Sequence, residues 1–241
     1  MNSWNAEHFR VTLFAPAGIP SPKDVLPAVF GIEVENSFER NSGAESSAEG
    51  SWNDVRAEVK RSVGRLDIVI KPKATDEAPT ELLPDNLEYI SRLIEVVGSW
   101  INSKDYLFNR VALSGRIVRA VADRVAGYRK FAEMVEIISF RDGISDVNFQ
   151  VNVPFRSVVM DGMKVNVVSN WSVVCNRTIT ITAANSAAVV QENYFLQCIP
   201  DISSDENRSD PLGNGFILEL LLEMRNKVHE LVEAGVKNVN S

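Results

Sequence analysis

The chain of 241 residues is poor in the two residue types on which most familiar catalytic and zinc sites depend. It has two histidines, His8 and His229, and two cysteines, Cys175 and Cys198. No pair of these four residues has the spacing of a zinc site or of a nucleophile with its base. The sequence therefore indicates no catalytic residue, no metal ligand and no cofactor, and it favours a function without enzymatic activity.

A long apolar run is also missing. No segment approaches the roughly 20 apolar residues that span a bilayer, and the first residues contain no basic region followed by an apolar stretch. We expect a cytoplasmic protein without membrane contact, in which both cysteines are reduced.

Positive charge is in deficit. The chain carries 25 basic and 32 acidic residues, a net charge of -7, which argues against general affinity for nucleic acid because a polyanion needs a positive surface. Any such surface must be local. Hydrophobic residues make up 45% of the chain, enough for a substantial core, so the chain as a whole is not disordered.

The first half of the sequence alternates between strand patterns and polar connections. A β-rich run at 9–14 predicts a strand, 24–30 a short helical turn, and the alternating residues at 55–59 and 66–70 a β-hairpin with one buried face. Residues 35–51 are mostly Glu, Asn, Ser, Gly and Ala, with Phe38 as the one aromatic before Trp52. This composition predicts a mobile loop inside the domain, since little apolar surface offsets the entropy of ordering it.

The middle of the chain carries helical periodicity. Apolar residues at three- and four-residue steps predict a helix that begins at Asp85 or Asn86 and runs to Ile101. The pattern at 110–121 fits a strand or a helix, and Gly115 favours the strand. Residues 126–138 form a second predicted helix.

Four β-rich runs, at 147–155, 164–174, 177–182 and 193–199, follow in the second half. Turn residues separate them, which is typical of an antiparallel meander. The last predicted element is a helix of about 20 residues between Asn214 and Gly235, with Gly235 as its C-terminal cap.

Together these patterns predict an α+β fold in which one or two antiparallel meanders are covered on one face by helices, including a long amphipathic C-terminal helix. A strand hairpin followed by a long helix occurs at 55–103 and again at 147–234, so the chain has two similar halves. We expect one unit over 1–241, with a subdivision into 1–125 and 126–241 that share one core.

The strongest local signal is basic, with six cations between positions 110 and 130 against one acid, Asp123. The six are Arg110, Arg116, Arg119, Arg124, Arg129 and Lys130. Because the guanidinium fork suits phosphate and carboxylate, the segment predicts an anion site or a contact with an acidic partner. The alternative is a solvated surface on which these side chains pair with the chain's own acids.

Two acidic patterns suggest metal sites only weakly. Asp54, Glu58 and Lys60, with Asp67 and Lys71 on the returning strand, share residue types with metal-dependent nucleases, but an ordinary half-exposed hairpin explains them better. The segment 201–210 has oxygens at alternating positions like a calcium loop, yet it lacks the glycine and the final glutamate of such loops. We interpret it as a solvated acidic turn.

The C-terminal helix has a wide apolar stripe, which suggests that it binds a partner as well as the core. The stripe residues are Ile217, Leu221, Met224, Val228 and Val232. Trp100 and Trp171 are predicted core residues, whereas Trp4 and Trp52 lie near polar segments and are predicted to be exposed.

We therefore interpret the chain as a cytoplasmic protein-binding protein, acting as a homo-oligomer or as an accessory subunit of a larger assembly. The alternative is a nucleic-acid or nucleotide binder that uses the basic segment 110–130, with nuclease activity if the hairpin holds a metal. The two hypotheses differ in whether the arginines contact phosphates.

Overall fold

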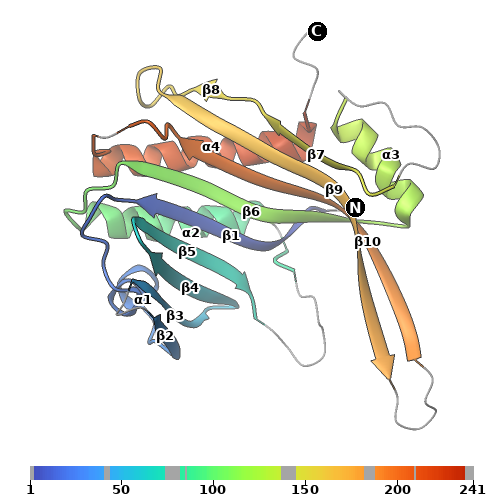
Figure 1. Ribbon diagram of the computed structural model, residues 1–241, viewed down its shortest axis with the longest axis horizontal. Helices are drawn as coiled ribbons and strands as arrows, with labels where there is room; N and C mark the ends of the chain where they lie inside the picture. Colours follow the sequence, from blue (N-terminus) through green and yellow to red (C-terminus); the bar gives the residue numbers. More distant parts are fainter. Residues whose placement is uncertain are drawn as a thin grey trace.

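The computed structural model describes residues 3–40, 44–73, 82–84, 86–136, 145–181, 188–208 and 210–236, which form an α+β fold (Figure 1). Ten antiparallel strands form one sheet, with the order β2-β3-β4-β5-β1-β6-β10-β9-β7 and with β8 paired to β9. The predicted fold class is confirmed.

The strands are β1 (Asn5–Phe14), β2 (Asn36–Arg40), β3 (Glu45–Trp52), β4 (Val55–Ser62), β5 (Arg65–Pro72), β6 (Arg110–Val121), β7 (Asn148–Asn152), β8 (Phe155–Arg156), β9 (Lys164–Ile181) and β10 (Ala188–Ser204). The helices are α1 (Pro22–Phe30), α2 (Asn86–Asn102), α3 (Arg124–Met134) and α4 (Asn214–Ala234). No helix in these ranges is long and apolar enough to cross a bilayer.

The order of elements repeats once along the chain. A strand, a helix, four strands and a helix (β1, α1, β2–β5, α2) are followed by the same succession (β6, α3, β7–β10, α4). The first strands of the two halves, β1 and β6, pair with each other at the centre of the sheet, and each half extends outward from them. The boundary between the two successions falls between α2 and β6.

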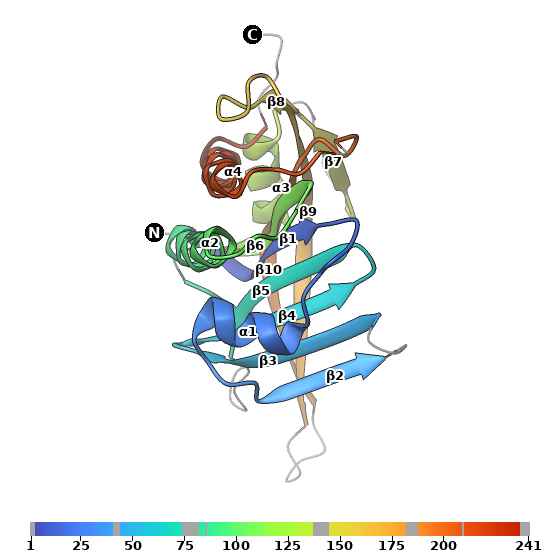
Figure 2. The same cartoon turned by 90° about the vertical axis from the view of Figure 1, so that its left-hand side faces the viewer.

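The helices lie on one face of the sheet. Figure 2 shows α2 and α4 side by side there, and Gly98 of α2 lies so close to Leu218 of α4 that an added Cβ would be 2.5 Å from its Cδ1. The main core lies between these two helices and the inward residues of the central strands. A second, smaller cluster lies under α3 and contains Phe131, Trp171 and Cys198.

Most predicted elements are present at the expected places. The strand at 9–14 extends back to Asn5, the turn at 24–30 is α1, and the hairpin at 55–70 is β4 and β5. The segment 110–121 is a strand, and the last helix ends at Gly235, whose N–H bonds to Leu231 O. The helix predicted over 126–138 is α3, which begins at Arg124 and ends at Met134; residues 137 and 138 lie outside the described ranges.

The prediction of a mobile loop at about 35–51 is wrong for the described part of this range, because β2 and β3 pair there; residues 41–43 lie outside the described ranges. All five residues of β2 are exposed, so its order comes from backbone pairing with β3, whose other side pairs with β4. Ala48 is fully buried, and an added Cβ at Gly50 would meet Leu26 of α1 at 3.6 Å. The apolar surface that covers this polar segment comes from α1, which its own composition does not reveal.

The runs expected as separate strands at 164–174 and 177–182 belong to one continuous strand, β9. Its partner β10 is correspondingly longer than the predicted 193–199. The two strands pair from Val165 with Ser204 to Ile181 with Ala188, so the residues between the two runs cause no break.

Gly115 lies at the seam between the halves, where β6 pairs with Phe9 of β1. An added Cβ would lie 2.7 Å from Phe9 Cδ1 and 2.9 Å from the carbonyl oxygen of His8. We expect Gly115→Val to lower the free energy of unfolding by roughly 1–3 kcal/mol, because overpacking displaces the central strands. Urea denaturation measures this.

Gly215→Ala in the first turn of α4 is the matched control. Nothing lies within 4 Å of the Cβ it would add, and alanine favours helix, so stability should stay unchanged or rise by up to about 1 kcal/mol. Equal losses for both variants would contradict a steric role for Gly115.

Candidate functional site

The six cations of the segment 110–130 do not form one site. Alternation along β6 places Arg110 and Arg116 on the sheet face opposite the helices, and Arg119 on the helix side. Arg124, Arg129 and Lys130 belong to α3. The structure therefore divides the predicted anion or partner surface among three places.

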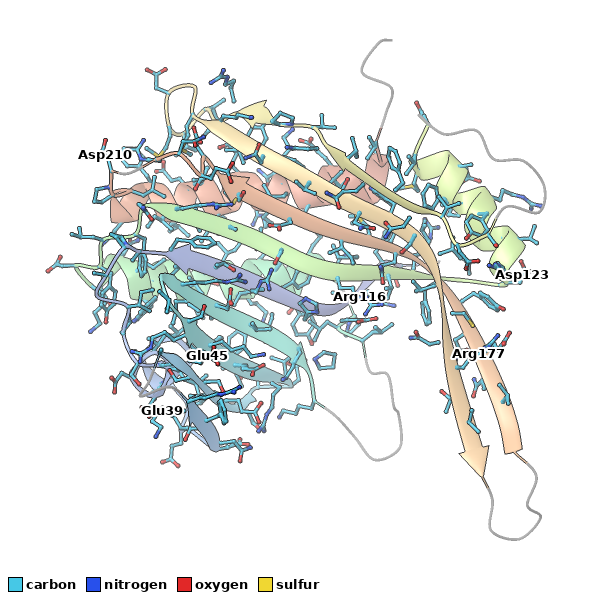
Figure 3. The ribbon with its side chains drawn as sticks, viewed as in Figure 1. Glu39, Glu45, Arg116, Asp123, Arg177 and Asp210 are labelled. Carbon is cyan, nitrogen blue, oxygen red and sulfur yellow. The ribbon has the colours of Figure 1, made fainter. Side chains whose placement is uncertain are left out.

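On the open sheet face, Arg110 and Arg116 already have partners. The Arg110 guanidinium lies 4.8 Å from the centroid of the Phe14 ring and donates to Ser203 Oγ at 3.2 Å. Arg116, labelled in Figure 3, donates to Gln197 Oε1 at 2.6 Å and forms an ion pair with Glu7 at 3.0 Å. Arg116 thus pairs with one of the chain's own acids, whereas the contacts of Arg110 are a hydroxyl and an aromatic ring.

Arg124 lies at the start of α3 beside Asp123, the N-cap residue whose carboxylate accepts from Ala126 N. Its guanidinium forms an exposed ion pair with Asp146 at 3.0 Å. Such exposed pairs contribute little to stability.

Arg119, Arg129 and Lys130 gather around one cavity of about 240 Å³ where the end of β6 meets α3. Lys130 Nζ lies 2.5 Å from Glu133 Oε2. The pKa of the Glu133 carboxyl is lowered, first by its hydrogen bond from Lys130 and also by the charges of Arg119 and Arg129. This is the one place where cations of the predicted segment converge.

The hairpin residues considered for a nuclease lie in ion pairs on the open sheet face. Glu58 accepts from Lys71 at 3.0 Å and pairs with Lys60 at 3.1 Å, while Asp67 accepts from Thr12. Asp54 lies apart, hydrogen-bonded by Tyr89, and this bond raises the pKa of Tyr89 to about 12. Within the described ranges, no three acidic, histidine or cysteine side chains gather where a metal could bind.

His8 belongs to the same open face. Burial is the main reason why its pKa is lowered, and the charges of Arg10, Arg116, Lys60 and Lys71 lower it further. The imidazole is therefore kept neutral at pH 7 by its burial and by the cations around it.

The acidic segment 201–210 does not form a calcium loop. Asp201 to Ser204 are the end of β10, and the Asp205 carboxylate accepts from the backbone N–H of Asn207 at 3.0 Å. That bond lowers the pKa of Asp205. The carboxylate thus closes a local turn, and position 209 lies outside the described residues.

The five residues expected to bind a partner through the C-terminal helix are core residues. They are at most 4% exposed: Ile217, Leu221, Met224, Val228 and Val232. The stripe is wide because α4 packs against α2 on one side and against β6 and β10 on the other. The expected partner helix is thus buried and offers these side chains to no partner.

The cysteines and tryptophans divide between core and surface. Cys198 is buried, which raises the pKa of its thiol, whereas Cys175 is exposed. Trp100 and Trp171 are buried as predicted. Trp4 and Trp52 are half-buried rather than exposed, because Trp4 packs on Trp171 and Trp52 on Phe30.

The most distinctive surface feature is a two-stranded arm, which we define as residues 175–181 of β9 and 188–193 of β10. In Figure 1 it projects away from the sheet at the lower right. β7 pairs with β9 only as far as Ser172, and β6 pairs with β10 only as far as Tyr194. Beyond these residues no described strand pairs with either outer edge of the arm.

One face of the arm continues the sheet face that the helices cover, but no described helix covers it on the arm. Trp171 and Val173 on β9 lie under α3, and strand alternation places Arg177 and Ile179 on this same face. Ile179 pairs with Val190, and these side chains are 61% and 55% exposed. Among the described residues, they are the one cross-strand pair in which both members are exposed large hydrophobics.

Sequence reasoning missed the arm as a site because it divided β9 in two. The run at 177–182 alternates threonine with isoleucine, which is a strand signal, but its exposure depends on where the neighbouring strands end. A strand of 18 residues, far above the usual length, is the signal that would have pointed to it.

Comparisons of the chain with protein families, with characterised proteins and with solved structures gave no match. What the chain does is therefore inferred from its own residues.

Proposed function

We propose that this chain is a protein-binding protein that acts as a homodimer joined through the β9–β10 arm. The observation that carries this proposal is the exposed Ile179–Val190 pair on a ribbon whose two edges have no described partner strand. Isolated two-stranded ribbons are only marginally stable in water, so an additional strand would complete the arm.

The charge of the arm favours a second copy as the partner. Two chains of net charge -7 repel each other, but the charges of Arg177 and Glu192 on the arm cancel, because Arg177 Nε lies 2.8 Å from Glu192 Oε1 in an ion pair. Edge strands that avoid pairing usually carry unpaired charges or proline, and the described part of the arm has neither. An antiparallel pairing of two arms about Ile179 would be closed by a two-fold axis.

The position of the arm suits this arrangement. It projects beyond both β6 and β7, so two arms could meet while the bodies of the two copies stay apart (Figure 3, where Arg177 marks the arm). Because most of the acidic surplus lies outside the arm, this separation also reduces the repulsion between the copies.

Light scattering on the purified chain tests the proposal. We expect twice the mass of a single chain, and we expect the double variant Ile179→Lys with Val190→Lys to be a folded monomer. Burying an unpaired ammonium at a contact costs enough to weaken association more than tenfold. Val63→Lys, which alters a side chain 87% exposed in the β4–β5 turn, is the matched control and should leave the dimer intact.

If the chain is a monomer that co-purifies with one discrete protein, and the double variant loses that protein, the partner of the arm is a different protein and not a second copy. A monomer unaffected by either change would remove the arm from the proposed function.

A further inference from the structure

We propose that the cavity between β6 and α3 binds the phosphate group of a small phosphate monoester. This site is independent of the arm and of the proposed dimer. It uses three of the six cations in the basic segment, Arg119, Arg129 and Lys130, which the fold brings together from two elements.

The charge of the cavity favours an anion. Three cations line it with one acid, Glu133, and the lowered pKa of Glu133 keeps that carboxylate ionised at neutral pH. Lys130 pairs with Glu133, so the charges of Arg119 and Arg129 are left over. This surplus of two positive charges matches the dianion of a phosphate monoester.

The arginines have unused donors. In the part of the chain that the structure describes, neither Arg119 nor Arg129 has a hydrogen bond or an ion pair, whereas Arg110, Arg116 and Arg124 each have at least one. Each guanidinium presents a planar fork of N–H donors, which matches two oxygens of a phosphate group. Two such forks at one cavity provide more donors than a single carboxylate accepts.

The remaining lining is small and apolar: Val121, Ala122 and Ala126. Short side chains leave the space open, and apolar walls strengthen the attraction between the guanidinium groups and an anion. A cavity of about 240 Å³ has the volume of about eight water molecules, at ~30 Å³ each, which is enough for a phosphate group.

The test measures binding of glycerol phosphate, with sulfate as a second dianion and sodium chloride at equal ionic strength as the reference. We expect a saturable rise in melting temperature with glycerol phosphate and with sulfate, but none with chloride. Between pH 7.5 and 5.5 the affinity for glycerol phosphate should fall roughly fourfold, because its second pKa is about 6. Sulfate keeps its charge, so its affinity should not change.

Two variants connect the binding to the cavity. Arg119→Gln should weaken binding of glycerol phosphate by about tenfold to a hundredfold, and Arg119→Lys, which keeps the charge but loses the fork, should weaken it less. Arg124→Gln removes an arginine of the same segment outside the cavity and should have no effect. If Arg119→Gln does not fold, the lysine variant still gives a result.

Three results would overturn the proposal. The first is a melting temperature that rises no more with glycerol phosphate than with chloride. The second is equal weakening by Arg124→Gln and Arg119→Gln. The third is salt-dependent binding of an oligonucleotide that survives Arg119→Gln while glycerol phosphate does not bind, since this would place the anion contact elsewhere on the sheet.

Discussion

Leu221→Asp is expected to unfold the protein or to lower its free energy of unfolding by more than about 4 kcal/mol, because it buries a charge without a partner. Leu221 is fully buried on α4, which packs against α2 and against β6 and β10. Water cannot reach the new carboxylate unless α4 separates from the sheet. Circular dichroism and urea denaturation measure the loss.

Phe216→Asp on the same helix is the matched control. Phe216 is 46% exposed and lies in the first turn, where a carboxylate interacts favourably with the helix dipole. The free energy of unfolding of the Phe216→Asp variant should stay within about 1 kcal/mol of that of the unmodified protein. A folded Leu221→Asp protein that has lost a partner would contradict the core role of α4 and restore it as a contact surface.

The two long helices were predictable from sequence because helical periodicity is local. Each turn of α2 and α4 repeats the apolar spacing, and the fold only adds what covers the stripe. The width of the stripe on α4 has two causes that look alike in sequence, an external partner and an internal one. The structure shows that the partner is internal, since Leu218 of α4 packs against Gly98 of α2, a helix that is distant in sequence.

The β2–β3 hairpin could not be predicted from composition. Its order depends on pairing with β4 and on α1, and neither is visible in the segment itself. The length of β9 is a similar case, because a strand signal does not tell where the neighbouring strands end. In both cases the missing information is tertiary.

The division of the basic segment was in part predictable. Once 110–121 is a strand, even and odd positions must face opposite sides, which separates Arg110 and Arg116 from Arg119. Strand alternation does not predict that α3 folds back over the end of β6. That return places Arg129 and Lys130 beside Arg119, and the helix is held there by the small cluster beneath it.

Trp171→Ala is the second change for which we expect a large loss, roughly 3–5 kcal/mol in the free energy of unfolding. The indole is fully buried in the cluster under α3 and packs edge-on against Trp4, with ring centroids 6.2 Å apart. Its Nε1–H donates to Ser169 Oγ at 3.0 Å, so the truncation leaves a cavity and an unused acceptor.

Trp52→Ala, in the other half of the chain, is the control of equal size, because its ring is half-buried against Phe30. We expect it to lower the free energy of unfolding clearly less, since less apolar area is removed from contact. Phe131 of α3 packs in the same cluster as Trp171, so we expect Trp171→Ala to affect phosphate binding as well as stability. Where the Trp171→Ala protein still folds, α3 should loosen and the rise in melting temperature with glycerol phosphate should shrink, while Trp52→Ala leaves it unchanged. A Trp171→Ala protein with full phosphate binding would show that the cations are positioned by β6 and not by the packing of α3.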